Sequence, residues 1–244
     1  MEYLAERLAG IPGVVAVTLG GSRATGRARE DSDWDFGLYY RDALDPDDIA
    51  ALGWPGRVFA PGDWGPVVNG GAWLEVDGVE VDLIYRRLDE VVFWTTEAEA
   101  GRFEIQREVG YVAGLATYVV AGELALGRVL FGELPRPSFP ERLVGTAPPV
   151  WFDLAAGALH FADVYASRGD RVGCLANLGQ AALATAQGRL VAAAEWALNE
   201  KGILERAGLA SLQETLRGTD RHLSDVAGEV RRALDLPGTR WSSG

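Results

Sequence analysis

The sequence is poor in the side chains that form disulfides, zinc sites and hydrolase triads. It holds one cysteine, Cys174, and two histidines, His160 and His222. A single cysteine excludes an internal disulfide and is typical of a reducing compartment such as the cytoplasm. Neither histidine has a second histidine or a cysteine at the spacing of a zinc site. Ser22 has no neighbouring histidine and lacks the Gly-x-Ser-x-Gly frame, which argues against a serine hydrolase.

Long apolar runs are also missing. The longest candidate, residues 112–126, is interrupted by Gly114, Gly122 and Glu123 and falls short of the ~18 residues of a membrane span. The first residues of the chain mix acids with apolar side chains and lack the basic-then-apolar order of a signal peptide. We therefore expect a cytoplasmic protein with no membrane partner.

Basic residues are outnumbered by acidic ones. Lysine and arginine total 23 against 35 aspartates and glutamates, which gives a formal net charge of −12. The arginines are dispersed among acids, whereas a protein that binds nucleic acid normally presents a basic patch. This balance argues against a nucleic-acid partner and is compatible with a cationic small molecule, which a negative field attracts.

The most informative residues that are present lie between positions 14 and 36. An apolar stretch, residues 14–19, predicts a strand that leads into the turn Gly20-Gly21-Ser22, and Asp33 and Asp35 follow at the entry of a second predicted strand. Residues i and i+2 of a strand share a face, so the two carboxylates stand side by side. Such a pair is costly unless a cation lies between the carboxylates, and Mg²⁺ prefers hard oxygen ligands. Because a glycine-rich turn that opens a helix also offers N–H groups to phosphates, the pattern predicts a metal-and-nucleotide site.

This pattern resembles the signature of the polymerase β-like nucleotidyltransferase superfamily. That signature is an apolar residue, glycine, glycine or serine, a spacer, and then Asp-apolar-Asp-apolar. Leu19 or Gly20 through Ser22, followed after ten residues by Asp33-Trp34-Asp35-Phe36, satisfies each position. The resemblance implies nucleotidyl transfer from a nucleoside triphosphate, with Asp33 and Asp35 as metal ligands. The residues that it implies near the triphosphate are Gly20, Gly21, Ser22 and Arg23.

The superfamily also uses a third acid on a neighbouring strand. Residues 74–85 are predicted to form a hairpin, because Asp77-Gly78 is a strong turn signal. Alternation places Glu80 and Asp82 on one face of its second strand. The string from Val81 to Tyr85 is similar to the third-acid strand of the superfamily, so we predict Asp82 as the third metal ligand and general base. Glu80 is the alternative base. For either acid, the alternative to a catalytic role is a place on the solvent-exposed face of an antiparallel sheet.

One lysine, Lys201, stands in a chain that otherwise uses arginine. A compact ammonium is not interchangeable with a guanidinium. The string Asn199-Glu200-Lys201, at the predicted end of the longest helix, resembles the helical domain of aminoglycoside-type nucleotidyltransferases, which implies a contact with the triphosphate. The alternative is a solvated lysine in the last turn of a helix. Arg189 and Glu195, on the same predicted helix, are further candidates for lining a cleft, against an exposed helix face.

The apolar periodicity predicts an α+β protein in two parts. A polymerase β-like nucleotidyltransferase domain, a mixed sheet flanked by helices, is expected over residues 1–108, and a helical substrate-binding bundle over residues 109–244. Predicted strands cover residues 14–19, 34–40, 72–76 and 79–85. Predicted helices cover residues 2–9, 22–27, 88–100, 109–126, 151–167, 172–198, 203–208, 211–217 and 223–234. Pro148-Pro149 predicts a break, and residues 134–140 a linker.

Together these features predict a nucleotidyltransferase that depends on Mg²⁺. Two ions are expected at Asp33, Asp35 and Asp82, with ATP as the expected co-substrate. The expected acceptor is a hydroxyl of a small cationic molecule, and the resemblance implies an aminoglycoside-like antibiotic, hence antibiotic resistance. Two alternatives remain: a toxin–antitoxin nucleotidyltransferase that modifies a protein or tRNA, and a non-catalytic nucleotide-binding module. The nucleotide base, the acceptor and the oligomeric state stay open.

Overall fold

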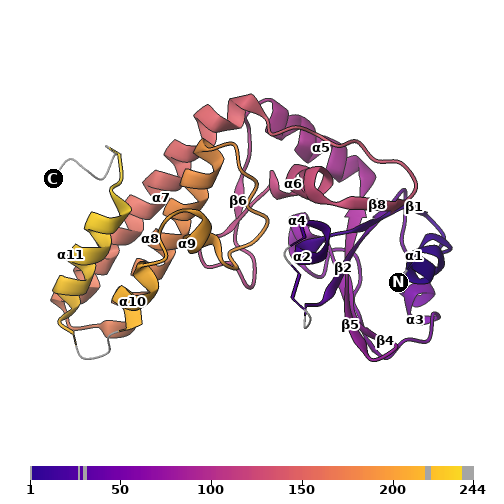
Figure 1. Cartoon of the computed structure of the whole chain (residues 1–244), viewed down its shortest axis with the longest axis horizontal. Helices are drawn as coiled ribbons and strands as arrows, with labels where there is room; N and C mark the ends of the chain where they lie inside the picture. The colour runs from indigo at the N-terminus through magenta and orange to yellow at the C-terminus, as the bar shows by residue number, and fades with distance from the viewer. Residues whose placement is uncertain (1, 27, 30–31, 218–220, 238–244) are drawn as a thin grey trace. The chain divides into compact units, whose positions relative to one another are not determined.

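The computed structural model describes residues 2–26, 28–29, 32–217 and 221–237. The chain forms two compact units, each built from two stretches of sequence (Figure 1). The first unit comprises Met1–Glu97 and Thr117–Ser138, and the second comprises Ala98–Ala116 and Phe139–Gly244. The predicted α+β class is confirmed, since a mixed sheet precedes a region of packed helices.

A six-stranded sheet forms the centre of the first unit, in the order β3-β4-β5-β2-β1-β8. Its strands are β1 (Val14–Leu19), β2 (Trp34–Tyr40), β3 (Gly56–Val58), β4 (Gly71–Val76), β5 (Val79–Arg87) and β8 (Arg128–Phe131). The pair β2–β5 is parallel, and the other described neighbours are antiparallel. The predicted hairpin is confirmed: β4 and β5 are joined by Asp77 and Gly78, with φ of 54° and 77°, the left-handed values that a tight hairpin turn requires. The edge strand β8 has no counterpart among the strands that we predicted.

One face of this sheet packs against helices α1 (Glu2–Ala9) and α3 (Pro46–Ala50). The period-two alternation of the strands supplies the buried side chains of that face, among them Phe36 on β2 and Leu83 on β5, which are 1% and 0% exposed. Asp45 accepts a hydrogen bond from the Asp47 N–H and so caps α3. The residues between the buried ones therefore point to the opposite face, which carries the acids of the predicted site.

The opposite face is joined to helix α6 (Val119–Leu126) by an ion pair between a buried arginine and a half-buried glutamate. Arg86 on β5 donates to both carboxylate oxygens of Glu123, at 2.6 and 2.7 Å. It also donates to the carbonyls of Val68 and Tyr85, at 2.7 and 3.0 Å. Arg86 is 4% exposed, so this network satisfies a charge that would otherwise be buried at great cost. The ion pair anchors Thr117–Ser138 within the first unit, to which α4 (Gly65–Val68) and most of α5 (Leu88–Glu99) also belong.

The second unit is built on two long helices, α7 (Glu141–Ser167) and α8 (Arg171–Ala192), against which α11 (Leu223–Leu234) packs (Figure 1). Asp170 caps α8 by accepting from the Gly173 N–H at 2.9 Å. The unit is completed by a small hairpin, β6 (Ile105–Gln106) and β7 (Leu115–Ala116), and by the short helices α9 (Ile203–Arg206) and α10 (Leu212–Arg217). No helix of the described residues combines the length and apolar character needed to cross a membrane.

Three sequence predictions about residues 109–244 are wrong. The first is the predicted break at Pro148-Pro149 before a helix over residues 151–167. Helix α7 instead begins at Glu141 and runs through both prolines, because packing buries Pro148 and Trp151 and outweighs the local cost of proline. The predicted helix over residues 109–126 exists only as α6, because Gly110 and Gly114 adopt positive φ and the chain forms β7.

The third error concerns the helix predicted over residues 172–198. Helix α8 ends at Ala192, where the N–H groups of Ala194 and Glu195 turn back onto the carbonyls of Val191 and Leu190. Ala194 takes a positive φ of 55° there. Lys201 therefore lies in a turn that precedes α9, and not at the end of a helix.

We predict that Glu123→Ala lowers the free energy of unfolding of the first unit by about 3 kcal/mol, because it removes the carboxylate that the buried Arg86 guanidinium contacts through both Nε and Nη2. Asp89→Ala is the control: its partner Arg87 lies 3.5 Å away and both side chains are well exposed, so a change of at most about 0.5 kcal/mol is expected. Urea unfolding followed by tryptophan fluorescence measures both. Equal effects of the two substitutions would contradict a structural role for the Arg86–Glu123 pair.

Candidate active site

Asp35 and Asp82 lie in register on the parallel strands β2 and β5. Neighbouring strands are about 4.8 Å apart, and residues in register share a face, so the two carboxylates project side by side. Their chain neighbours Phe36 and Leu83 are buried on the other face. Both acids are half-buried. The structure thus brings together two of the three predicted metal ligands directly.

Asp33 and Glu80 lie close to this pair in the chain. Asp33 precedes the first residue of β2, and Glu80 is an exposed residue of β5, two positions before Asp82. Asp33, Glu80 and Asp82 line one depression of about 370 Å³ on the first unit. Of the two candidate bases, Asp82 is the one in register with Asp35, so the geometry favours Asp82.

The Gly20-Gly21-Ser22 turn is built against Asp35. Gly21 has a positive φ of 59°, and a Cβ placed on it would lie 1.7 Å from Oδ2 of Asp35. The N–H of Gly20 donates to the backbone carbonyl of Asp35 at 2.8 Å. Glycine is thus required at position 21 both for its backbone conformation and for the space that the carboxylate occupies. Helix α2 (Gly21–Ala24) begins at this contact and carries Ser22, half-buried, in its first turn.

Arg23 ties α2 to the residues that lead into β2. Its Nε donates to the carbonyls of Ser32 and Asp33, at 3.2 and 3.1 Å, and its Nη2 donates to Ser32 at 2.5 Å. The guanidinium carbon lies 4.3 Å from the centre of the Trp34 ring, a cation–π distance. These contacts hold the backbone at Asp33, which gives Arg23 a positioning role. Its predicted contact with the triphosphate stays a prediction.

The predicted residues of the second unit have mainly structural partners. Lys201 is exposed, and its backbone N–H donates to Oδ1 of the Asn199 side chain at 3.0 Å. Glu200 accepts from the N–H groups of Val112 and Ala113, both at 2.8 Å, and so fixes the loop before β7.

Arg189 and Glu195 likewise have partners within the second unit. Arg189 donates to the carbonyls of Ala207 and Leu234, at the ends of α9 and α11. Glu195 lies 3.4 Å from Arg206. Arg189 therefore joins two helix ends to α8.

The acids of the first unit offer the oxygen ligands that Mg²⁺ prefers. Among the described residues, no three acidic, histidine or cysteine side chains are gathered closely enough to hold an ion by themselves. Magnesium does not need such a cage, since it is usually bound by one or two carboxylates, water and the phosphates of a substrate. The pair Asp35 and Asp82, with Asp33 nearby, fits that mode of binding.

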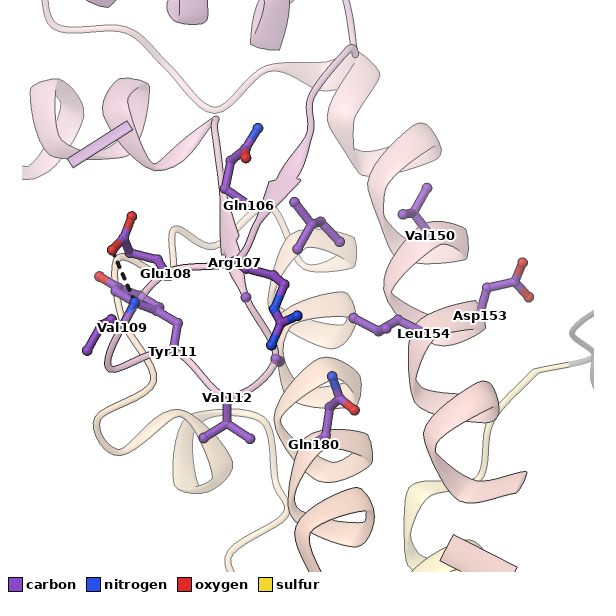
Figure 2. A pocket seen from close by; sticks show the side chains of 13 residues that line it. Gln106, Arg107, Glu108, Val109, Tyr111, Val112, Val150, Asp153, Leu154 and Gln180 are labelled. Carbon is purple, nitrogen blue, oxygen red and sulfur yellow. Dashed lines mark hydrogen bonds between the residues drawn. The ribbon is translucent and has the colours of Figure 1, made fainter. Parts of the chain in front are cut away.

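A second cavity, of about 1010 Å³, lies within the second unit (Figure 2). The hairpin segment 105–114 borders it on one side and helices α7 and α8 on the other, with Arg107 and Gln180 among its lining side chains. None of the predicted site residues, all of which lie in the described part of the chain, lines this cavity. It has room for a small polar molecule but carries neither the acid pair nor the glycine turn.

Two residues of the depression, Trp73 and Glu75, were missed by the sequence predictions. The pairing of β4 with β5 sets Trp73 opposite Asp82 and Glu75 opposite Glu80, and both residues line the depression. A signal was present, because a two-residue turn at Asp77-Gly78 determines these pairs by counting outward from the turn.

Residues 1–99 match the family model described as "Nucleotidyltransferase domain". Similar solved structures include a nucleotidyltransferase-like protein from Exiguobacterium sibiricum 255-15, with 13% identity and a TM-score of 0.43 over 94% of this chain and 69% of that one. They also include an aminoglycoside 6-adenyltransferase from Bacillus subtilis, with 11% identity and a TM-score of 0.30 over 100% of this chain and 92% of that one. No curated protein matches the sequence.

We predict that Gly21→Ala destabilises the first unit by about 3 kcal/mol, since it combines left-handed backbone strain with a clash against Asp35. Gly26→Ala is a matched control, because Gly26 has a similar φ of 69° but no described atom lies within 4 Å of a Cβ there. Only the strain, about 1 kcal/mol, is expected for the control. Thermal unfolding compares the two variants, and equal melting temperatures would show that Asp35 does not pack on Gly21.

Proposed function

We propose that the protein, whose residues 1–99 match a nucleotidyltransferase domain model, transfers a nucleotidyl group, adenylyl from ATP in the simplest case, to a hydroxyl of a small cationic molecule. The observation that carries the proposal is the register of Asp35 with Asp82, directly against the Gly20-Gly21-Ser22 turn. Acids for a metal and a glycine turn for phosphates thus meet at one end of the sheet. A cytoplasmic location, where nucleoside triphosphates are available, completes the proposal.

The reaction is an in-line displacement at the α-phosphorus. The acceptor oxygen forms a bond to phosphorus, the bond to the bridging oxygen of the β-phosphate breaks, and pyrophosphate leaves. Asp33, Asp35 and Asp82 would hold Mg²⁺, which would neutralise charge on the triphosphate and lower the pKa of the acceptor hydroxyl. Asp82 takes the proton of that hydroxyl, with Glu80 as the alternative base.

The phosphate-binding part of the proposal rests on the glycine turn. The N–H of Gly20 is used by the carbonyl of Asp35, so Gly20 sets the position of the turn. The N–H groups of Gly21 and Ser22 are the proposed donors to the triphosphate. Arg23 keeps this turn and Asp33 in register through its contacts with the Ser32 and Asp33 carbonyls.

A cationic acceptor is supported by the charge of the depression beside the acids. Its described lining carries four carboxylates, those of Asp33, Glu75, Glu80 and Asp82, and no basic side chain. A depression lined by one sign of charge concentrates ligands of the opposite sign. Aminoglycosides, which carry both amines and hydroxyls, are therefore the first acceptors to test.

Purified protein with Mg²⁺, each nucleoside triphosphate and a panel of aminoglycosides is expected to release pyrophosphate. Asp35→Asn and Asp82→Asn should lower the rate by at least about 100-fold, because each removes charge from the metal site. Chelation with EDTA should stop the reaction, and excess Mg²⁺ should restore it. The control is Asp89→Asn, an exposed acid at the start of α5. A full rate in Asp35→Asn would refute the proposed chemistry.

The role of Lys201 is tested separately. If its ammonium contacts the triphosphate, Lys201→Ala raises the KM for the nucleotide about tenfold, because a charge-assisted contact is lost, and leaves the KM for the acceptor unchanged. Lys201→Arg should restore part of the affinity. Unchanged steady-state constants in both variants would assign Lys201 to the solvated turn in which it lies.

A further inference from the structure

Trp73 occupies an unusual place for a tryptophan. It lies on β4 directly opposite Asp82 on β5, and residues so paired in an antiparallel sheet have Cβ atoms about 5 Å apart on the same face. Half of its surface, 50%, is exposed. A large aromatic ring is thus presented to solvent beside the predicted third acid, where it forms part of the wall of the depression.

The ring is held in place by two other aromatic side chains. Trp64 stacks on Trp73 with ring centres 5.3 Å apart and an interplanar angle of 29°, and Phe59 meets it edge-on at 4.9 Å. Aromatic pairs at these distances stabilise one another beyond the area that they bury. Trp73 is therefore a supported, pre-positioned surface and not a loose side chain.

The surroundings of Trp73 in the depression favour positive charge. Glu75, two residues along β4, shares the face of Trp73 and lies opposite Glu80. Like charges directly opposite each other in a sheet are destabilising, and a cation bound between them would relieve that repulsion. A tryptophan face also attracts cations.

Gly56 allows β3 to approach β4 closely at the wall of the depression. Its φ is 145°, and a Cβ there would lie 2.1 Å from the carbonyl oxygen of Trp73. The close approach of β3 to β4 therefore excludes a side chain at this point of the lining.

The strand order separates this surface from the phosphate turn. In the order β4-β5-β2-β1 the acids Asp82 and Asp35 lie on the two central strands. The Gly20-Gly21-Ser22 turn follows β1 on one side, and Trp73 lies on β4 on the other. In an in-line displacement the entering and leaving oxygens are on opposite sides of the phosphorus. If pyrophosphate leaves on the side of the turn, the acceptor enters on the side of Trp73.

We infer that Trp73 and Glu75 form the acceptor subsite and select a ring-shaped polyol that carries a protonated amine, with the ring or its ammonium on the face of Trp73 and an amine at Glu75. This inference rests on the proposed function, because it assigns the acceptor side of the same site. The negative charge of Glu75 disfavours the alternative occupant of this surface, the nucleotide with its phosphates.

The test is calorimetric binding to the full-length protein, with kanamycin as the probe and its fully N-acetylated, uncharged form as the comparison. Wild type should bind kanamycin and not the acetylated form. Trp73→Ala should weaken kanamycin binding about tenfold, Trp73→Phe less, and Glu75→Gln several-fold. The matched controls are Phe93→Ala, an aromatic residue with a similar exposed fraction of 54% on α5, and Glu6→Gln on α1, and both should bind as wild type does. The affinity for Mg²⁺-ATP should be the same in all these variants.

Each outcome bears on one proposal or the other. Binding of kanamycin and Mg²⁺-ATP without release of pyrophosphate would refute the proposed function but support the subsite. If the enzyme turns over and the KM for the acceptor is the same in Trp73→Ala and Phe93→Ala, the subsite is refuted and the proposed function is supported. Weaker ATP binding in Trp73→Ala, with kanamycin binding unchanged, would assign the ring to the nucleobase and overturn the inference. Equal affinity for kanamycin and its acetylated form, or no binding of either, would overturn the preference for a charged amine.

Discussion

The parallel pairing of β2 with β5 is the constraint on which the rest of the site depends. Its register sets Asp35 beside Asp82. Parallel strands cannot be joined by a tight turn and need a crossover of a dozen or more residues. Here residues 41–78 supply it, and they return to the sheet as β4 on the outer side of β5. The same crossover therefore brings the two acids together and sets Trp73 and Glu75 beside them.

One face of the sheet is divided between a closed end and an open end. At the closed end Arg86 is buried and bound to both oxygens of Glu123 on α6. At the open end Asp35 and Asp82 are half-buried, and Asp82 borders a depression rich in carboxylates. The alternation of side chains makes this division possible, because every second residue of β5 is in the core and the residues between them can carry charged side chains. Ionic contacts thus stabilise one end, and at the other end charge is available for a ligand.

Local sequence patterns predicted much of the fold correctly. The hairpin at Asp77-Gly78 follows from a turn that only residues tolerant of positive φ can make. Predictions failed where distant contacts outweighed a local preference. The helix across Pro148 is maintained by packing in the second unit, and the glycines of residues 109–116 turn a predicted helix into a hairpin. Helix α8 ends before Lys201 because the chain turns back at Ala194, and Glu200 then holds the following segment against the loop at Val112.

The sequence by itself determined which groups the site contains and their local order. The Gly20-Gly21-Ser22 turn and the pair Asp33 and Asp35 follow from the local pattern, because residues i and i+2 of a strand share a face. The contact of Gly21 with the Asp35 carboxylate, which leaves no room for a Cβ, is visible only in the folded chain. Only the tertiary structure decided which of the later acids lies beside Asp35, because that depends on strand register across a long crossover. It also decided that Thr117–Ser138 returns to the first unit. These arrangements depend on contacts between residues far apart in the chain, which a local pattern does not encode.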